Sequence, residues 1–140
     1  QEDFGNGIIR GPKDTLIDGM SVLTFAISRP PKSVQQIIDD YKIDVNTDID
    51  YFLIHQANKL IVDRVVKKLH LPLKKVPYDL EEFGNLGGAS IPSLMVTRIA
   101  EPMRSEKPIK MLCSSFGLGL SWGTMIITAN NVIIPELIEI

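Results

Sequence analysis

Apolar side chains recur at two different spacings along the chain, and these spacings alternate between those of helices and those of strands. Helical spacing runs through residues 34–41 and again through residues 58–69, where one face is apolar and the other is charged. Stretches of strand length that are rich in apolar residues occupy residues 51–54, 109–113 and 122–128. The pattern therefore predicts two amphipathic helices and three strands.

The pattern does not settle the secondary structure of the segment before residue 34. An apolar run at residues 20–27 fits a helix or a strand, because its spacing does not choose between the two periods. The Arg-Pro-Pro triplet at 29–31 is expected to end this run, since proline lacks an amide donor and restricts the residue before it. Ser33 and Gln36 form a capping-box pattern, which predicts that the next helix begins just after Ser33.

Weaker signals fill the second half of the chain. Residues 75–78 are compatible with a short strand, and residues 81–88 are expected to form a glycine-rich loop. Ser90 is expected to be the N-cap of a third helix, which tolerates Pro92 in its first turn. The apolar residues 132–134 fit either a further strand or a tail.

The resulting order is helix, strand, helix, strand, helix, strand, strand, which is typical of a layered α/β domain with helices packed on a sheet. A length of 140 residues predicts one domain spanning residues 1–140. Within it, we expect residues 1–16 to be a leading loop or short strand and residues 130–140 to be a tail.

The charge balance and the cysteine count exclude several classes of protein. With 15 basic and 17 acidic side chains and a net charge of -2, the chain offers no electrostatic reason to bind nucleic acid or an acidic membrane. No apolar run approaches the roughly 20 residues of a transmembrane helix. The single cysteine excludes an internal disulfide framework and a cysteine zinc site, and it favours a reducing, cytoplasmic location.

Three loops next to the predicted strands carry residue types that binding or catalysis would need. His55 directly follows a predicted buried strand, where α/β sheets place ligands, and Asn58 opens the next helix. Asn85 lies in the glycine-rich loop, and residues 117–119 make a turn whose amides could serve as an oxyanion hole. Each loop also has a structural interpretation, namely a satisfied histidine beside a helix start, a flexible loop ending in an N-cap, and a β-turn with a bulge.

Cys113 could join His55 and Asn85 in a nucleophilic triad. It ends an apolar strand, however, and a lone cysteine beside apolar residues is usually a small core residue, which is what we expect here. A metal site is not expected, because His55 and His70 lack the spacing of a metal-binding motif.

Together, these motifs resemble the C-terminal half of a 3-oxoacyl-[acyl-carrier-protein] synthase III, or ketoacyl synthase III, of the thiolase-like superfamily. The matching residues are Asp18-Gly19-Met20, His55-Gln56-Ala57-Asn58, Gly84-Asn85-x-x-x-Ala89-Ser90-Ile91-Pro92 and Phe116-Gly117-x-Gly119-x-x-Trp122-Gly123. The resemblance covers residues 16–129, and the ordered motifs are specific together although each is weak alone. It implies one half of a thiolase-like fold, a layered α/β arrangement with a mixed sheet covered by helices.

The resemblance also implies an activity and its residues. Members of the family are acyltransferases of fatty acid or related biosynthesis, which join an acyl group to a malonyl unit by decarboxylative Claisen condensation. His55 and Asn85 match the catalytic histidine and asparagine that donate hydrogen bonds to the developing enolate. Gly19 and Asn58 match positions that contact the phosphopantetheine or CoA arm, and the backbone at Leu118 matches the amide that holds the acyl thioester oxygen.

The implied substrates are carried on the phosphopantetheine of acyl carrier protein or on CoA, and no other cofactor is implied. The implied partners are acyl carrier protein, an acyl-CoA or malonyl thioester, and the N-terminal half of the same enzyme, with a homodimer as the complete form. Leu60 stands where many relatives have a basic residue at the carrier docking site, and whether Lys59 replaces that charge is left open by the sequence.

The N-terminal half, which holds the acyl-accepting cysteine in the family, has no counterpart in these residues. The chain begins without Met and shows no signal-peptide pattern, so we expect a mature fragment or an excised piece that is catalytically silent alone. Apolar surface that the other half would cover should then be exposed. Three other interpretations stay open: a relative that transfers the acyl group to another acceptor, such as an amine, a hydroxyl or a polyketide, a non-catalytic acyl-carrier-binding module, and an α/β domain with coincidental motifs.

Overall fold

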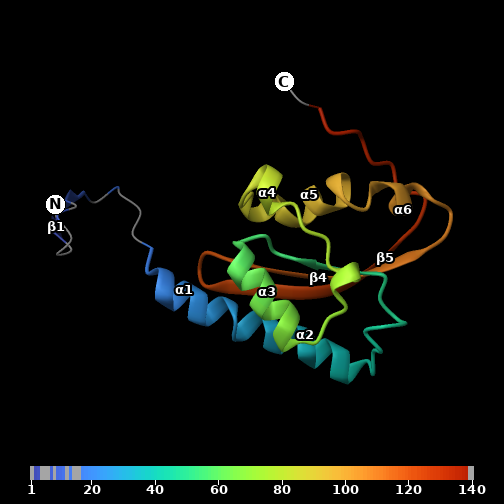
Figure 1. Cartoon of the computed structure of the whole chain (residues 1–140), viewed down its shortest axis with the longest axis horizontal. Coiled ribbons are helices and arrows are strands. Elements are labelled where there is room, and N and C mark those ends of the chain that lie inside the picture. Colours follow the sequence, from blue (N-terminus) through green and yellow to red (C-terminus); the bar gives the residue numbers. More distant parts are fainter. Residues whose placement is uncertain (1, 4–6, 8, 12, 14–16, 139–140) are drawn as a thin grey trace.

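A three-stranded mixed sheet with helices on both faces forms the body of the protein (Figure 1). The computed structural model describes residues 2–3, 7, 9–11, 13 and 17–138. The elements are β1 (Glu2–Asp3), β2 (Ile9–Arg10), α1 (Gly19–Ala26), α2 (Arg29–Asp40), β3 (Tyr51–Ile54), α3 (Lys59–Lys68), η1 (Leu73–Lys75), α4 (Leu80–Phe83), η2 (Gly87–Ala89), α5 (Ser90–Thr97), α6 (Ala100–Arg104), β4 (Ile109–Gly117) and β5 (Ser121–Ala129). Their alternation confirms the predicted α/β class.

The order of strands in the main sheet is β3-β4-β5. β3 runs parallel to β4, with Ile54 opposite Ser114, and β4 and β5 form an antiparallel hairpin that closes at the pair Gly117 and Ser121. The carboxyl ends of β3 and β4 and the hairpin turn therefore lie at one end of the sheet. β5 is an edge strand among the described residues, while β1 and β2 pair separately.

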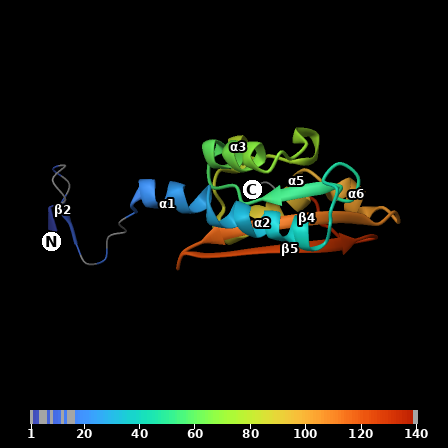
Figure 2. The same ribbon diagram turned by 90° about the horizontal axis from the view of Figure 1, so that it is seen from below.

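Alternate residues of β3 point to opposite faces of the sheet, and each face has its own hydrophobic cluster. Phe52 and Ile54 pack with residues of α2 and α3, whereas Leu53 packs with residues of α5 and α6. Figure 1 shows α5 and α6 on one side of the strands and α2 on the other, and the view from below in Figure 2 looks onto α2 with the strands behind it. The sheet is thus held between two helical layers, as the resemblance implied.

The undecided run at residues 20–27 forms helix α1, and its cap explains why. The side chain of Asp18 accepts hydrogen bonds at 3.1 Å from the backbone amides of both Met20 and Ser21, which satisfies two donors of the first turn. A strand would leave the Asp18 carboxylate without this role.

The predicted start of α2 was wrong. The helix begins at Arg29, and Pro30 and Pro31 lie in its first turn instead of ending the preceding element. Amides of the first turn have no partner within the helix, so proline is tolerated there, and both prolines are buried. Ser33 consequently lies inside the helix and is not its N-cap.

Three smaller predictions also need correction. Residues 75–78 form no strand, because the segment from Leu73 to Lys75 is a 3₁₀ turn. Ser90 is the first residue of α5 and makes no capping hydrogen bond. Residues 81–88 include most of α4 and the start of η2 and are not one continuous loop. For residues 132–134, the sequence left a strand or a tail open, and the structure shows a tail. The predicted strand at 51–54, the helix from 59 and the final hairpin are confirmed.

The described helices are also short. None of them combines the length and the apolar composition that crossing a bilayer requires.

Candidate functional site

His55 is the first residue after β3, and the sheet fixes its position. Its backbone amide donates to the carbonyl of Ser114 at 2.9 Å, which continues the parallel ladder by one residue. Its side chain is only 5% exposed, and its ring packs edge-on against Phe116 with the ring centres 4.8 Å apart. The imidazole is therefore held by both the backbone and a neighbouring ring.

The two ring nitrogens of His55 differ in access. Nδ1 is buried and has no hydrogen-bond partner among the described residues. This leaves Nε2 as the nitrogen that a substrate can reach. Burial lowers the pKa of His55 below its ordinary 6.5, because desolvation disfavours the charged ring. The ring is therefore neutral at pH 7 and can offer one N–H to an incoming oxygen.

An aromatic cluster connects this histidine to α1. Phe25 of α1 packs edge-on against Phe116 and Trp122, with ring centres 6.0 Å and 5.6 Å apart. Phe116 in turn contacts His55. The cluster gives the imidazole an apolar wall, which is consistent with its lowered pKa.

Asn85 is presented by the loop that follows α4. Gly84 has a positive φ of 65°, which a residue with a side chain adopts only with strain, and the chain turns there. The Asn85 side chain is exposed, and its Oδ1 accepts a hydrogen bond from the amide of Gly87 at 3.0 Å. Since this bond occupies the oxygen, the Nδ2 amino group is left free to donate outward.

The loops that carry His55 and Asn85 converge on the same pair of parallel strands. His55 follows β3, whereas η2 and α5, which follow Asn85, contact β4 and β3 respectively. Figure 1 shows the start of α3 and the β4–β5 turn at one end of the sheet. The pairing of the two side chains and their mutual distance stay predictions.

The backbone at Leu118 lies in the β4–β5 turn at this same end. Its side chain is 96% exposed, and its carbonyl accepts a hydrogen bond from the Ser121 hydroxyl at 2.8 Å. Gly119 follows with a φ of 120°. The turn is thus tightly folded and open to solvent. A backbone amide that donates to a substrate needs both a fixed position and access to solvent.

Gly19 and Asn58, the other predicted contacts, both begin helices. Gly19 starts α1, and apart from its chain neighbours and the backbone of its own helix no described atom lies within 4 Å of where a Cβ would stand, so the space beside it is open. Asn58 is the N-cap of α3, with Oδ1 accepting from the amide of Ile61 at 2.9 Å. The predicted position of Asn58 at the helix start is confirmed, and its contact with a ligand stays a prediction.

Cys113 is a core residue, as expected. It packs with Leu94 and Met111 between the sheet and the α5–α6 layer and is 5% exposed. Burial raises the pKa of its thiol from an ordinary 9.0 to about 11, so it is poorly suited to act as a nucleophile at neutral pH. Among the described residues, no group of three or more His, Cys, Asp or Glu could hold a metal ion.

Sequence reasoning missed three buried polar residues near these loops. Gln56 is fully buried, with Nε2 donating to the carbonyl of Ile54 and Oε1 unpartnered, and the hydroxyl of Ser90 is buried without a partner. Asp79 is 2% exposed and bonds to α5. Gln56 and Ser90 lie within the motifs and could have been found there, whereas nothing in the local pattern marks Asp79.

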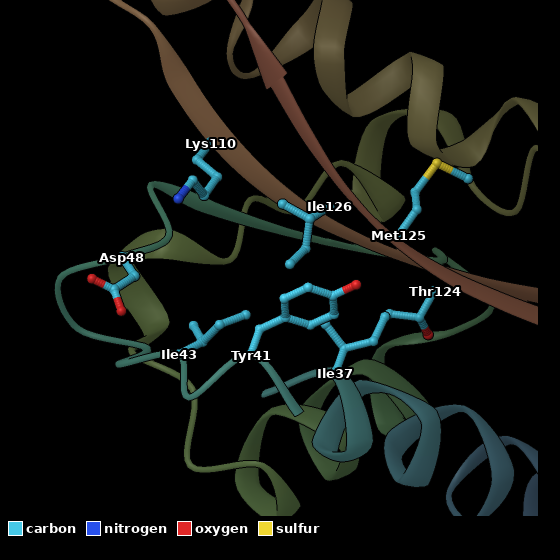
Figure 3. A pocket seen from close by; sticks show the side chains of 8 residues that line it. All are labelled: Ile37, Tyr41, Ile43, Asp48, Lys110, Thr124, Met125 and Ile126. Carbon is cyan, nitrogen blue, oxygen red and sulfur yellow. The ribbon is translucent and has the colours of Figure 1, made fainter. Parts of the chain in front are cut away.

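A groove of about 540 Å³ lies elsewhere, between α2 and β5. Figure 3 shows the ring of Tyr41 in its middle, with Ile37, Ile43 and Ile126 around it. None of the predicted site residues lines this groove. It therefore has no part in the candidate site.

Comparison with known proteins identifies the family of the chain. The family described as 3-Oxoacyl-[acyl-carrier-protein (ACP)] synthase III C terminal matches residues 43–129. The Beta-ketoacyl-[acyl-carrier-protein] synthase III of Streptococcus pneumoniae (strain Hungary19A-6) is 41% identical over 115 residues, which are 80% of this chain and 35% of that protein. The chain thus spans about a third of the length of the relatives it matches.

Solved structures give the same result. The 3-oxoacyl-(acyl-carrier protein) synthase of Burkholderia xenovorans LB400 superimposes with a TM-score of 0.79 at 31% identity, covering 86% of this chain and 34% of that one. For the 3-oxoacyl-(acyl carrier protein) synthase III of Pseudomonas aeruginosa PAO1, the TM-score is 0.72 at 29% identity, covering 86% and 37%. These similarities confirm the predicted thiolase-like half.

Proposed function

Because the chain belongs to the 3-oxoacyl-[acyl-carrier-protein] synthase III C-terminal family, we propose that it is the C-terminal domain of a condensing enzyme that joins an acyl thioester to a malonyl unit on acyl carrier protein. The malonyl C–C bond to the carboxylate breaks, carbon dioxide leaves, and the electron pair remains as an enolate on the thioester. The enolate carbon then attacks an acyl-cysteine, a C–C bond forms, and the thiolate leaves. Negative charge therefore builds on the malonyl thioester oxygen.

The observation that carries this proposal is the state of His55. Its ring is buried, its pKa is lowered, and Nδ1 is buried without a partner, so Nε2 is the nitrogen that we expect to face the substrate. A neutral imidazole N–H aimed at the thioester oxygen stabilises the enolate as it forms, and a poorly solvated setting strengthens that hydrogen bond. Burial of the ring, to which the contact with Phe116 contributes, favours its uncharged form.

Asn85 supplies the second donor in this proposal. The amide of Gly87 holds Oδ1, which orients the Nδ2 group outward as the free end. Two donors from separate loops can then meet one oxygen. Loss of one donor from such a site typically lowers the rate by roughly 100- to 1,000-fold.

The acyl-accepting cysteine must come from elsewhere. Cys113 is buried, and its thiol pKa of about 11 leaves little thiolate at neutral pH. The proposal therefore assigns the nucleophile to the N-terminal half of the complete synthase, and residues 1–140 alone are expected to be catalytically silent. Homodimer formation and a cytoplasmic location stay predictions.

The phosphopantetheine arm would approach from the helix starts. Gly19 offers open space beside α1, and Asn58 retains a free amide group at the start of α3. Leu118 offers a backbone amide from the hairpin turn to the acyl thioester oxygen. For carrier docking, Lys59 is the neighbouring cation, although it lies 3.9 Å from Asp63 and over the ring of Tyr78.

The test is release of labelled carbon dioxide from a malonyl thioester by the complete synthase. His55→Ala and Asn85→Ala are each expected to lower this release by roughly 100-fold or more, while transfer of the acyl group to the nucleophilic cysteine continues. A matched control is His70→Ala, since His70 is exposed and lies at the far end of α3.

Two outcomes would overturn the proposal. Acylation of an acceptor without loss of carbon dioxide would indicate a relative with another acceptor. Unchanged biological activity in both variants would indicate a non-catalytic carrier-binding module.

A further inference from the structure

The segment from residue 79 to residue 90 begins and ends on the same helix. Its end is covalent, since Ser90 is the first residue of α5. Its beginning is tied by Asp79, whose Oδ2 accepts a hydrogen bond from the Ser93 hydroxyl of α5 at 2.6 Å. Asn85 lies near the middle of this closed loop, between two points that α5 fixes.

Asp79 is a buried acidic residue without a cationic partner among the described residues. It is 2% exposed, and no Lys, Arg or His among the described residues forms an ion pair with it. A buried carboxylate without a cation is costly unless hydrogen bonds satisfy it. The Thr97 hydroxyl is 3.3 Å from the same oxygen, but its proton has a better acceptor in the Ser93 carbonyl at 2.8 Å, so Ser93 is the main donor.

The backbone of Asp79 connects this hydrogen bond to the segment that leads to Asn85. The carbonyl of Asp79 accepts from the amides of Glu82 and Phe83 at 3.1 Å and 3.0 Å, which starts α4. α4 ends at Phe83, and its C-cap Gly84, with a positive φ, turns the chain directly into Asn85. Asp79 thus links α5 through its side chain to the first turn of α4 through its carbonyl.

We propose that Asp79 is a positioning residue for Asn85, acting through its bond to Ser93 to hold the loop in the geometry that points the Asn85 amide at the substrate. The inference rests on the proposed function, because it assigns a purpose to the placement of Asn85. The ligand it serves is the thioester oxygen of a malonyl unit.

Arg98, which directly follows α5, makes a second connection to this loop, at the protein surface. Arg98 donates from Nε to the carbonyl of Tyr78 at 2.8 Å and pairs with Glu82 at 2.7 Å. Because Arg98 and Glu82 are exposed, this tie is screened by solvent and holds the loop less firmly. Loss of Asp79 is therefore expected to loosen the loop without releasing it.

The kinetic experiment uses the complete synthase with Asp79→Ala, Asp79→Asn and Ser93→Ala. Misplacement by about 1 Å can lower a rate roughly 100-fold, so we expect Asp79→Ala to reduce malonyl decarboxylation by about 10- to 100-fold in kcat, with little change in KM. Asp79→Asn keeps an oxygen for Ser93 and should recover much of the rate. Glu81→Ala is the matched control, because Glu81 is an exposed acid on α4 without a hydrogen bond or ion pair in the described structure.

Two further readouts separate positioning from general damage. Acyl transfer to the nucleophilic cysteine should be unchanged in all variants, since Asn85 takes no part in it. Hydrogen exchange of the peptide that contains Gly87 should become about 10-fold faster in Asp79→Ala, because the Asn85–Gly87 bond is less often formed.

Equal loss of acyl transfer and decarboxylation, or full activity in both Asp79→Ala and Ser93→Ala, would overturn the positioning role. Asn85→Ala in the same series keeps the two proposals apart. If Asn85→Ala leaves decarboxylation intact, the proposed function fails. If it abolishes decarboxylation and Asp79→Ala does not lower it, only the positioning role fails.

Discussion

Cys113 should resist alkylation in the folded chain, and the structure sets the size of the effect. Burial raises the pKa of its thiol from 9.0 to about 11. At pH values well below both numbers, the thiolate fraction is then about 100-fold lower than for a free thiol, because each pH unit is a factor of ten. Only the thiolate reacts with iodoacetamide, and the side chain is 5% exposed. We therefore expect labelling at pH 7.5 at least about 100-fold slower than for a free cysteine.

The pH profile of this reaction gives a sharper criterion than its rate. Labelling of the folded chain should rise tenfold per pH unit through pH 9 and level off only near pH 11, whereas labelling in urea should level off near pH 9. The unfolded chain becomes ionised first, so the free energy of unfolding should fall by about 2–3 kcal/mol as the pH rises through this window. Mass spectrometry of quenched samples measures the labelling. Fast labelling that saturates near pH 8 would refute the core assignment and revive Cys113 as a nucleophile.

Three other predictions follow from burial and charge. Because the pKa of His55 is lowered, unfolding stability should be constant above pH 6.5 and decrease below it, and the decrease should shrink in His55→Ala, which denaturation at several pH values can check. Leu94→Ala should cost about 2–5 kcal/mol in urea denaturation, because Leu94 is fully buried, whereas exposed Leu73→Ala should stay within about 0.5 kcal/mol. The isolated chain should self-associate through β5, and Met125→Lys should weaken this self-association in sedimentation equilibrium. A wild-type chain that stays monomeric at all concentrations would contradict the prediction.

β5 and the residues around it carry no charged side chain. No Asp, Glu, Lys or Arg lies between Lys110 and Glu136, a stretch that includes all of β5. Natural edge strands are usually protected by charges, proline or a covering element. Met125 is 56% exposed on β5, beside the groove in Figure 3. Met125 therefore leaves apolar surface exposed on an uncharged edge strand.

Residues 51–54 and 59–68 were predictable from the sequence because their structure is decided locally. β3 is apolar throughout since both of its faces are covered, and α3 is amphipathic since one of its faces is. The run at 20–27 was undecided only because the cap at Asp18 was not used as a signal. Pro30 and Pro31 were misassigned because a missing amide suits the first turn of a helix as well as the end of another element.

The candidate site likewise has a part that the sequence predicts and a part that it does not. His55 and Asn85 stand out because their loops carry recognisable motifs, yet the features that would make them donors are not local. The ring of His55 is buried against Phe116, which belongs to a strand that is distant in the sequence and adjacent in space. The anchor at Asp79 depends on a hydroxyl on a later helix. Periodicity and spacing describe neighbours along the chain, so they cannot reveal either contact.

The parallel pairing of β3 with β4 connects these parts. Parallel strands must end on the same side of a sheet, so the loop after β3 and the turn after β4 meet without any direct contact in sequence. The hydrogen bond from the amide of His55 to the carbonyl of Ser114 sets their register to one residue. A one-residue slip of β3 would exchange its two faces, move Leu53 into the α2–α3 layer, and turn the imidazole away from Phe116. The packing of the two hydrophobic clusters therefore enforces the orientation of His55, and core stability and donor geometry depend on the same register.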